Sequence, residues 1–315
     1  MYSGPALRPT SVQWIMKRSG FRNHLFPPDK LDHWAAHPRA PHASAPPAVA
    51  RRKAYIIRTD LDGRPVYEVV PKRMGDGPRR GHMLYLHGGA YVRPLVPFVH
   101  WPFIVRLAST LERTVTVPIY PLAPEHTYRD VFPFLLRIYD RILARRSADT
   151  VMFAGDSAGG SMALALCHAL RDAEMVQPSA ALLLSPWLDV RISHPDAQAV
   201  ARLDPALNIE HLREAGRRYA GGAPPDTPLV SPGLGPLTGL PPLTIFTGTH
   251  EVLNPDIRAF RRRAAAEGID MGWHELDRGM HCWMMTPGVH TRAAFDAMRR
   301  DYGLPVVSRE SREEP

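Results

Sequence analysis

One serine stands between two glycines in the segment 155–159, whose sequence is GDSAG. The segment follows a short apolar run, 151–154, and precedes a run of small and apolar residues, 158–173. A serine on a sharp turn between a strand and a helix projects its hydroxyl above the sheet, and the glycines remove the Cβ clashes of such a turn. The start of the helix brings free backbone N–H groups near that hydroxyl. This context predicts that Ser157 is a nucleophile in acyl transfer, rather than a serine that only caps a helix.

A serine hydroxyl needs a general base, and in sites of this kind the chain order is serine, acid, histidine. The histidines downstream of Ser157 are His168, His194, His211, His250, His274, His281 and His290. Several of them fall inside expected helices or in the middle of an expected strand. His281 instead follows the last apolar run, in the glycine-containing loop DRGMHCW. We predict that His281 is the general base.

The acid that orients this histidine should follow the preceding apolar run, 243–247, which continues as GTHEVLNPD. Glu251 lies in the loop just past that run. Asp256 follows Pro255 and is placed to start the next helix, where a carboxylate suits the helix dipole. We favour Glu251 as the acid and give Asp256 a structural role, although the residues alone leave both open.

These side chains require a framework, and the chain alternates short apolar runs with helical stretches. The expected strands are 83–86, 114–120, 151–154, 181–184, 243–247 and 271–276. The expected helices are 98–111, 130–145, 158–173, 208–219, 256–267 and 290–302. This alternation predicts an α/β fold whose mostly parallel sheet is covered by helices on both faces. Two β-rich arms around Asp62 and Gly63 predict a hairpin that adds an antiparallel edge.

Composition narrows the class of protein further. The chain has 315 residues, a net charge of +8 and two cysteines, Cys167 and Cys282, far apart in sequence. Its arginines occur as scattered pairs and one triplet, which favours a solvated basic surface over a nucleic-acid site. We expect no metal, no disulfide and no membrane span, and a cytoplasmic protein.

Four segments together resemble the hormone-sensitive-lipase-like carboxylesterases, a branch of the α/β-hydrolases. They are HGGAY at 87–91, YPLAPEHTY at 120–128, GDSAGG at 155–160 and SPWLD at 185–189, in the order that this family has them. The resemblance covers about residues 50–303. It implies hydrolysis of a small-molecule ester without a cofactor, by the serine–histidine–acid chemistry expected above.

The resemblance also implies an oxyanion hole built from backbone N–H groups. Its donors would be Gly89, Ala90 and Ala158, with Gly88 shaping the loop. This chain departs from the family at three positions: it has Ala90 where a third glycine is frequent, Glu251 where the acid is usually aspartate, and Pro121 where arginine is common. A salt bridge usual in the family is therefore in doubt here.

A cap over the site is the next implication of the resemblance. The expected organisation is an N-terminal cap segment, 1–48, a hydrolase core, 49–189 and 226–308, a cap insertion, 190–225, and a disordered tail, 309–315.

Tyr91, Trp187 and Trp283 are candidate walls of the substrate pocket. Because Ala90 and a cap both restrict the site, short- to medium-chain esters are the expected substrates. A lactonase or amidase would use the same residues, and a non-catalytic receptor on this fold is the alternative of another class. A homodimer is compatible with the sequence.

Overall fold

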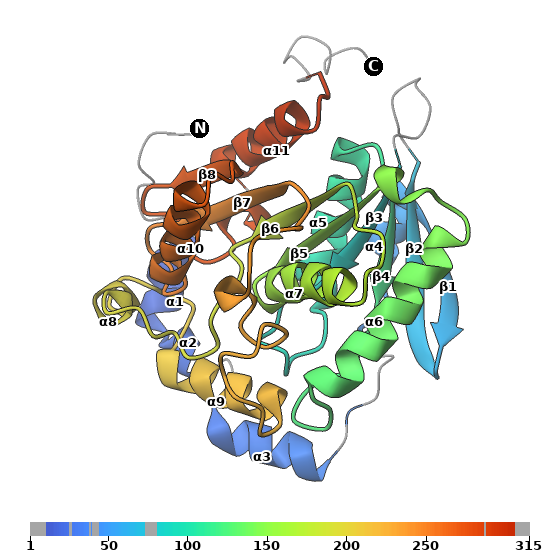
Figure 1. The fold of residues 1–315 in the computed structure, drawn as a ribbon. Coiled ribbons are helices and arrows are strands. Elements are labelled where there is room, and N and C mark those ends of the chain that lie inside the picture. The colour runs from blue at the N-terminus through green and yellow to red at the C-terminus, as the bar shows by residue number, and fades with distance from the viewer. Residues whose placement is uncertain are drawn as a thin grey trace.

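Eight strands form one sheet in the computed structural model, which describes residues 11–24, 27–37, 39, 44–72, 81–286 and 288–305. The strands are β1 Ala54–Leu61, β2 Arg64–Pro71, β3 His82–Leu86, β4 Thr114–Pro118, β5 Val151–Asp156, β6 Ala180–Leu184, β7 Leu243–Gly248 and β8 Gly272–Leu276. Their order in the sheet is β1-β2-β4-β3-β5-β6-β7-β8 (Figure 1). The predicted strands are confirmed to within a few residues at their ends.

The antiparallel part of the sheet is confined to one edge. β1 pairs with β2 through a hairpin in which Leu61 faces Arg64, and the tip residues Asp62 and Gly63 both have positive φ, as a tight two-residue turn requires. β2 runs antiparallel to β4, and every other pairing is parallel. The predicted hairpin and the mostly parallel sheet are therefore confirmed.

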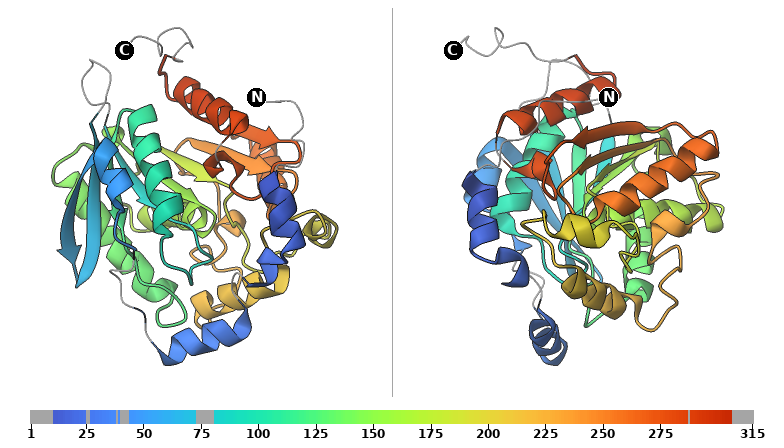
Figure 2. Two further views of the ribbon diagram at one scale, coloured as in Figure 1. Left: turned by 180° about the vertical axis from the view of Figure 1, so that it is seen from behind. Right: turned by 90° about the vertical axis from the view of Figure 1, so that its left-hand side faces the viewer.

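Helices cover both faces of the sheet. One face packs against α6 Tyr128–Leu143, α7 Ala158–Asp172 and α10 Asn254–Ala266, and the other against α5 Pro97–Thr110 and α11 Val289–Asp301 (Figure 2). Successive residues of a strand point to opposite faces of the sheet. Leu84 and Phe153 pack in the core on the α7 face, and Met83 and Met152 pack in the core on the α5 face. This double burial explains why the central strands are apolar runs without a polar alternation.

The strand order places a site between β3 and β5. The chain leaves β3 through α5 toward β4 on one side, and it leaves β5 through α7 toward β6 on the other. In open α/β sheets, ligands bind outside the carboxyl ends of the strands where the winding direction reverses. Ser157 follows β5 at this point, and the HGG loop follows β3.

Two segments far apart in sequence pack together beyond this end of the sheet, and they are called the cap below. The first consists of α1 Ser11–Arg18, α2 Phe21–His24 and α3 Pro28–Ala36, and the second of α8 Ala197–Ala201 and α9 Ile209–Ala220. Figure 1 shows α3 beside α9, where Arg218 pairs with Asp32 at 2.5 Å. Arg22 of α2 also donates to the Ala201 carbonyl at 2.7 Å.

The predicted boundaries of the core and the tail can be compared with the structure only in part. The short helix α4, Ala48–Lys53, leads into β1 at the expected start of the core. The expected tail, 309–315, and the first ten residues lie outside the described residues. Within the described part of the chain, no helix combines the length and the apolar character that crossing a bilayer requires.

Candidate active site

Ser157 sits on a strained turn between β5 and α7. Its φ of 54° and ψ of −121° fall where a residue with a side chain is rarely found, at a cost of about 1–3 kcal/mol. The turn needs glycine nearby, because a Cβ on Gly159 would lie 2.0 Å from the Leu86 carbonyl oxygen. Ser157 N–H donates to the Leu184 carbonyl at 2.8 Å, which ties the turn to β6. The geometry is that of a nucleophile held above the sheet.

The structure brings Glu251 against His281. Glu251 Oε2 accepts from His281 Nδ1 at 2.7 Å. The other carboxylate oxygen accepts from Thr247 Oγ1 at 2.6 Å, Gly248 N–H at 2.8 Å and Ser185 Oγ at 3.0 Å. Glu251 is fully buried, so these donors replace water and hold the carboxylate in one orientation.

Asp256, the alternative acid, lies in the first turn of α10 and faces a different cavity, together with Asp189 and His194. Burial and the neighbouring Asp189 raise the pKa of Asp256 to about 7. A carboxyl group near a second carboxylate holds its proton more tightly. Of the two carboxylates that the sequence left open, only Glu251 is hydrogen-bonded to the imidazole.

Ser157 and His281 line one cavity of about 240 Å³, called the active-site cavity below. Gly89 and Ala90 of the HGG loop line it beside the serine. The remaining walls come from both cap segments, from the end of β5, from α5 with the loop before it, and from the loop after His281: Phe21, Arg93, Val96, Val99, His100, Asp156, Ala206, Leu207, Leu212, Cys282, Met285 and Thr286. Residues of both cap segments therefore form part of the cavity wall.

The HGG loop presents its backbone to this cavity. Gly89 has a φ of 125°, and a Cβ there would lie 2.7 Å from the Arg93 carbonyl oxygen, so the turn requires glycine. Gly88 plays another part, since its N–H donates to Asp156 Oδ1 at 2.9 Å and is not available to a substrate. Ala158 is the first residue of α7, where a backbone N–H has no acceptor within the helix.

Comparison with known proteins agrees with this geometry. A family model described as the α/β-hydrolase fold matches residues 83–285. An acetyl-hydrolase of Streptomyces hygroscopicus is 35% identical over 208 residues, which are 64% of this chain and 67% of the relative. A solved hormone-sensitive lipase from a metagenome library has a TM-score of 0.79 at 25% identity, over 95% of this chain and 98% of its own.

A solved esterase of the bacterial hormone-sensitive lipase family has a TM-score of 0.75 at 26% identity, over 94% of this chain and 98% of its own. The chain belongs to the hormone-sensitive-lipase-like esterases of the α/β-hydrolase family. The family model begins at β3, so the cap segment α1–α3 and the β1–β2 hairpin of this esterase lie outside the matched residues.

Asp156 supports the HGG loop of the esterase from below. Besides Gly88 N–H, it accepts from Tyr85 Oη at 2.6 Å, and His100 Nε2 lies 3.5 Å from its other oxygen. Burial alone would raise the pKa of Asp156, but His100 and Tyr85 outweigh burial and the pKa is lowered. Neither Asp156 nor His100 was among the site residues predicted from the sequence. Asp156 could have been noticed because it belongs to the segment GDSAG that contains Ser157. The sequence around His100 gives no such signal, because only the packing of α5 places its side chain next to the HGG loop.

His87 anchors the loop and does not act as a base. Its ring stacks on Tyr120 with centroids 4.3 Å apart, and Nδ1 donates to the Gly88 carbonyl at 2.6 Å. Burial lowers the pKa of His87 to about 3, so the ring is neutral at working pH.

Cys282 contacts the other ring nitrogen of His281, the predicted general base. Its Sγ lies 3.5 Å from His281 Nε2, at the mouth of the active-site cavity. Burial raises the pKa of the Cys282 thiol, so it stays protonated at neutral pH. Burial lowers the pKa of His281, but Cys282 and Glu251 raise it, and the net direction is upward. With the thiol neutral, the Glu251 carboxylate is the charge that stabilises the imidazolium.

The expectation that Tyr91, Trp187 and Trp283 wall the pocket is corrected, because none of the three lines the active-site cavity. Tyr91 turns inward and stacks on Tyr219 of α9 and on Trp187, with centroid distances of 3.8 and 5.2 Å. Trp283 Nε1 donates to the Thr247 carbonyl at 2.9 Å and so braces the strand that carries the acid. All three side chains are buried in the hydrophobic core, where they pack behind the residues that line the cavity.

Glu125 has an ion-pair partner although position 121, where arginine is common in the family, is proline in this chain. Arg39, from the N-terminal part of the chain, pairs with Glu125 at 2.7 Å and also donates to the Ala123 carbonyl. An arginine distant in sequence therefore ties the segment 120–128 to the cap side of the molecule.

Proposed function

We propose that this esterase hydrolyses carboxylic esters with short- to medium-chain acyl groups through Ser157, His281 and Glu251. The observation that carries the proposal is that Ser157 and His281 line one cavity while Glu251 accepts from His281 Nδ1 at 2.7 Å. A carboxylate on Nδ1 keeps the proton on that nitrogen, which leaves the lone pair of Nε2 free to accept a proton.

In the first half of the reaction, Ser157 Oγ attacks the ester carbonyl carbon and His281 Nε2 takes its proton. The tetrahedral oxyanion is bound by the N–H groups of Gly89, Ala90 and Ala158, and losing one such donor typically costs about 3–4 kcal/mol. The intermediate then expels the alcohol, which takes the proton from Nε2.

In the second half, a water molecule gives one proton to Nε2 and attacks the acyl-enzyme. Collapse of the new intermediate breaks the bond to Ser157 Oγ and releases the acid, and the proton on Nε2 returns to the serine. Glu251 stabilises the imidazolium in both halves and keeps its negative charge.

The contact between His281 Nε2 and Cys282 Sγ belongs to the resting site in this proposal. A thiol is a weak hydrogen-bonding partner, so a small rotation that exchanges it for the serine hydroxyl is inexpensive. Catalytic hydrogen bonds often shorten only when substrate is bound.

The size of the active-site cavity supports the preference for modest acyl chains. At about 240 Å³ it is smaller than the 300–1,000 Å³ of pockets that enclose drug-sized ligands. The Ala90 methyl and the aliphatic side chains of the insertion, Leu207 and Leu212, occupy space that a longer chain would need.

The test compares hydrolysis of p-nitrophenyl acetate, butyrate and laurate by the native chain and by Ser157→Ala. We expect kcat to fall by about 10⁴-fold or more in the variant, with thermal unfolding little changed. We expect kcat/KM of the native chain to be lowest for laurate. Labelling by a fluorophosphonate, located by mass spectrometry, should occur at Ser157. Equal rates from the two proteins would end the proposal.

A further inference from the structure

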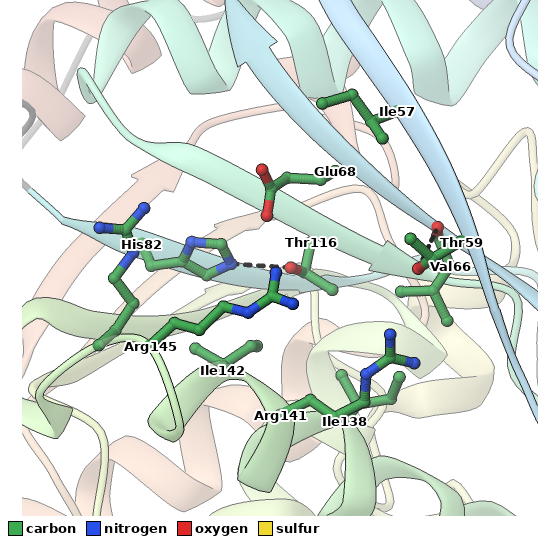
Figure 3. Close-up of a pocket in the computed structure, with 11 residues that line it drawn as sticks. Ile57, Thr59, Val66, Glu68, His82, Thr116, Ile138, Arg141, Ile142 and Arg145 are labelled. Atoms are coloured by element: carbon green, nitrogen blue, oxygen red, sulfur yellow. Dashed lines mark hydrogen bonds between the residues drawn. The ribbon is translucent and has the colours of Figure 1, made fainter.

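A second cavity, of about 250 Å³, shares no lining residue with the active-site cavity. Its floor is the face of β1, β2, β4 and β3, and its other wall is the C-terminal part of α6 with the turn that follows (Figure 3). Three arginines line it, Arg141, Arg145 and Arg146, so we call it the arginine pocket. Nothing in the proposed ester hydrolysis uses these residues.

The charge of the arginine pocket is positive on balance. All three arginines are exposed, and Glu68 is the single carboxylate among the described residues that line the pocket. Arg141 donates to the Asp60 carbonyl at 3.4 Å, whereas Arg145 and Arg146 stand beyond the end of α6. Arginines at a helix C-terminus are favourable without any ligand, because they meet the negative end of the helix dipole. The arginines alone therefore do not demand a ligand.

His82 provides the second, independent observation. Its side chain is buried, with 3% of the residue exposed, and Nε2 is hydrogen-bonded to Thr116 Oγ1 at 2.7 Å. Nδ1 has no hydrogen-bond partner in the described part of the chain, although His82 lines the pocket. Burial, with Arg146 and Arg113, lowers the pKa of His82 to about 4, so the ring is neutral. Buried polar atoms are usually hydrogen-bonded, so an unpartnered one that borders a cavity favours a polar occupant there.

The apolar part of the wall consists of Ile57, Val66, Ile138 and Ile142. Figure 3 shows Arg141 and Arg145 on the same side of the pocket as Ile138 and Ile142, facing Thr116 and Glu68 of the sheet. Val66, Ile138 and Ile142 are almost fully buried without any ligand, whereas Ile57 is 53% exposed, so Ile57 is the apolar surface that a hydrated inorganic anion would leave uncovered.

We propose that the arginine pocket binds a carboxylate with a short hydrocarbon chain. The carboxylate pairs with Arg145 and Arg146, whose planar guanidinium groups match its two oxygens, and the chain lies on the exposed side chain of Ile57. Acids of this chemical class are what hydrolysis of an aliphatic ester releases, but binding here does not depend on that activity.

Methyl NMR on the full chain labelled at isoleucine δ1 tests the proposal. Ile57, Ile138 and Ile142 line the arginine pocket, and no isoleucine is among the described residues that line the active-site cavity, so the two sites are told apart. Hexanoate should shift the three methyl signals saturably. Hexan-1-ol, which lacks the charge, and inorganic phosphate, which lacks the chain, should each bind at least tenfold more weakly.

Variants locate the carboxylate. Arg145→Gln combined with Arg146→Gln should weaken hexanoate binding tenfold or more, while Arg300→Gln, an exposed arginine at the end of α11, should leave it unchanged. Glu68→Gln should strengthen binding several-fold, because it removes the repelling charge, an effect that a purely structural role would not produce. Phosphate binding as tightly as hexanoate, affinity unchanged in the double variant, or no shift at the three methyl groups at high hexanoate would each overturn the proposal.

Discussion

The loops after β3 and β5 and the two cap segments meet at the same cavity but build it in different ways. The loops contribute backbone in conformations that few residues adopt, with a φ of 125° at Gly89 and 54° at Ser157. The cap contributes ordinary helices and loops whose apolar side chains, such as Phe21 and Leu207, reach the cavity. The comparison suggests that the chemistry is held by backbone geometry and buried hydrogen bonds, whereas substrate choice is set by side chains that can change without disturbing it.

Glu251, the acid in the proposed mechanism, offers the largest test of this division. Glu251→Gln keeps the shape but removes the charge and leaves an amide beside His281 Nδ1, so we expect kcat to fall by about 10³- to 10⁴-fold. Loss of the carboxylate also lowers the pKa of His281, because a stabilising charge is gone. The acid limb of the kcat/KM profile should therefore move to lower pH, since the base is active only when neutral.

The matched control is Asp256→Asn, five residues away in α10 and also largely enclosed. We expect its activity to stay within a few-fold of the native chain. Its effect should appear in stability instead. The pKa of Asp256 is about 7 in the folded chain against an ordinary value of 3.8, so the folded state binds the proton more tightly. Native stability should fall between about pH 4 and pH 7, and Asp256→Asn should flatten that fall. Equal activity losses in the two variants would contradict our choice of Glu251.

A smaller effect is expected when the backbone of the HGG loop is disturbed. Gly89→Ala puts a Cβ 2.7 Å from the Arg93 carbonyl oxygen and should turn the Gly89 and Ala90 N–H groups away from the oxyanion. We expect kcat to fall by about 10²- to 10³-fold with KM less affected, as for the loss of an oxyanion donor.

Gly222→Ala, at the end of the cap insertion, separates this effect from general backbone strain. Gly222 also has a positive φ, 80°, but a Cβ there meets nothing within 4 Å. Both variants should lose stability from the positive φ, measured by thermal unfolding, and Gly89→Ala should lose more because of its contact with Arg93, but only Gly89→Ala should lose catalysis. A Gly222→Ala variant that lost activity to the same degree would show that the division between loop and cap is wrong.

The same division explains what could be predicted from the sequence. The turn that carries Ser157 is local, because the glycines, the serine and the apolar runs around it are adjacent in sequence. The mostly parallel α/β fold follows from the alternation of such runs with helices, but the order of the strands does not. Glu251 and His281 could be placed because each comes directly after a strand. The residues that line the active-site cavity could not be predicted, because closeness to a site residue in the sequence does not determine where a side chain points. Tyr91 follows the loop closely and yet turns into the core to stack on Tyr219, 128 residues on.

The residues that do line the active-site cavity could not be identified from the sequence either. Phe21 and Leu207 come from segments nearly two hundred residues apart, and nothing in either segment marks an active site. His100 returns to the HGG loop only through the packing of α5, and the 3.5 Å contact between Cys282 and His281 depends on the left-handed backbone at Cys282. The direction of each side chain and contacts between distant segments determine these positions, and neither can be read from the local sequence.

The smallest expected effect is a change of chain-length preference from the cap. Leu207→Trp enlarges a side chain that lines the active-site cavity, so it should exclude longer acyl groups while leaving the loops untouched. We expect kcat/KM for p-nitrophenyl butyrate to fall about tenfold relative to acetate, the size of effect that a methylene or two produces in an apolar pocket. Leu203→Trp lies in the same insertion, 44% exposed and outside the cavity lining, and should leave the ratio unchanged. If Leu207→Trp lowered the acetate rate as strongly as the butyrate rate, the cap would hold part of the catalytic geometry, and side-chain walls and backbone chemistry would not be separable in this esterase.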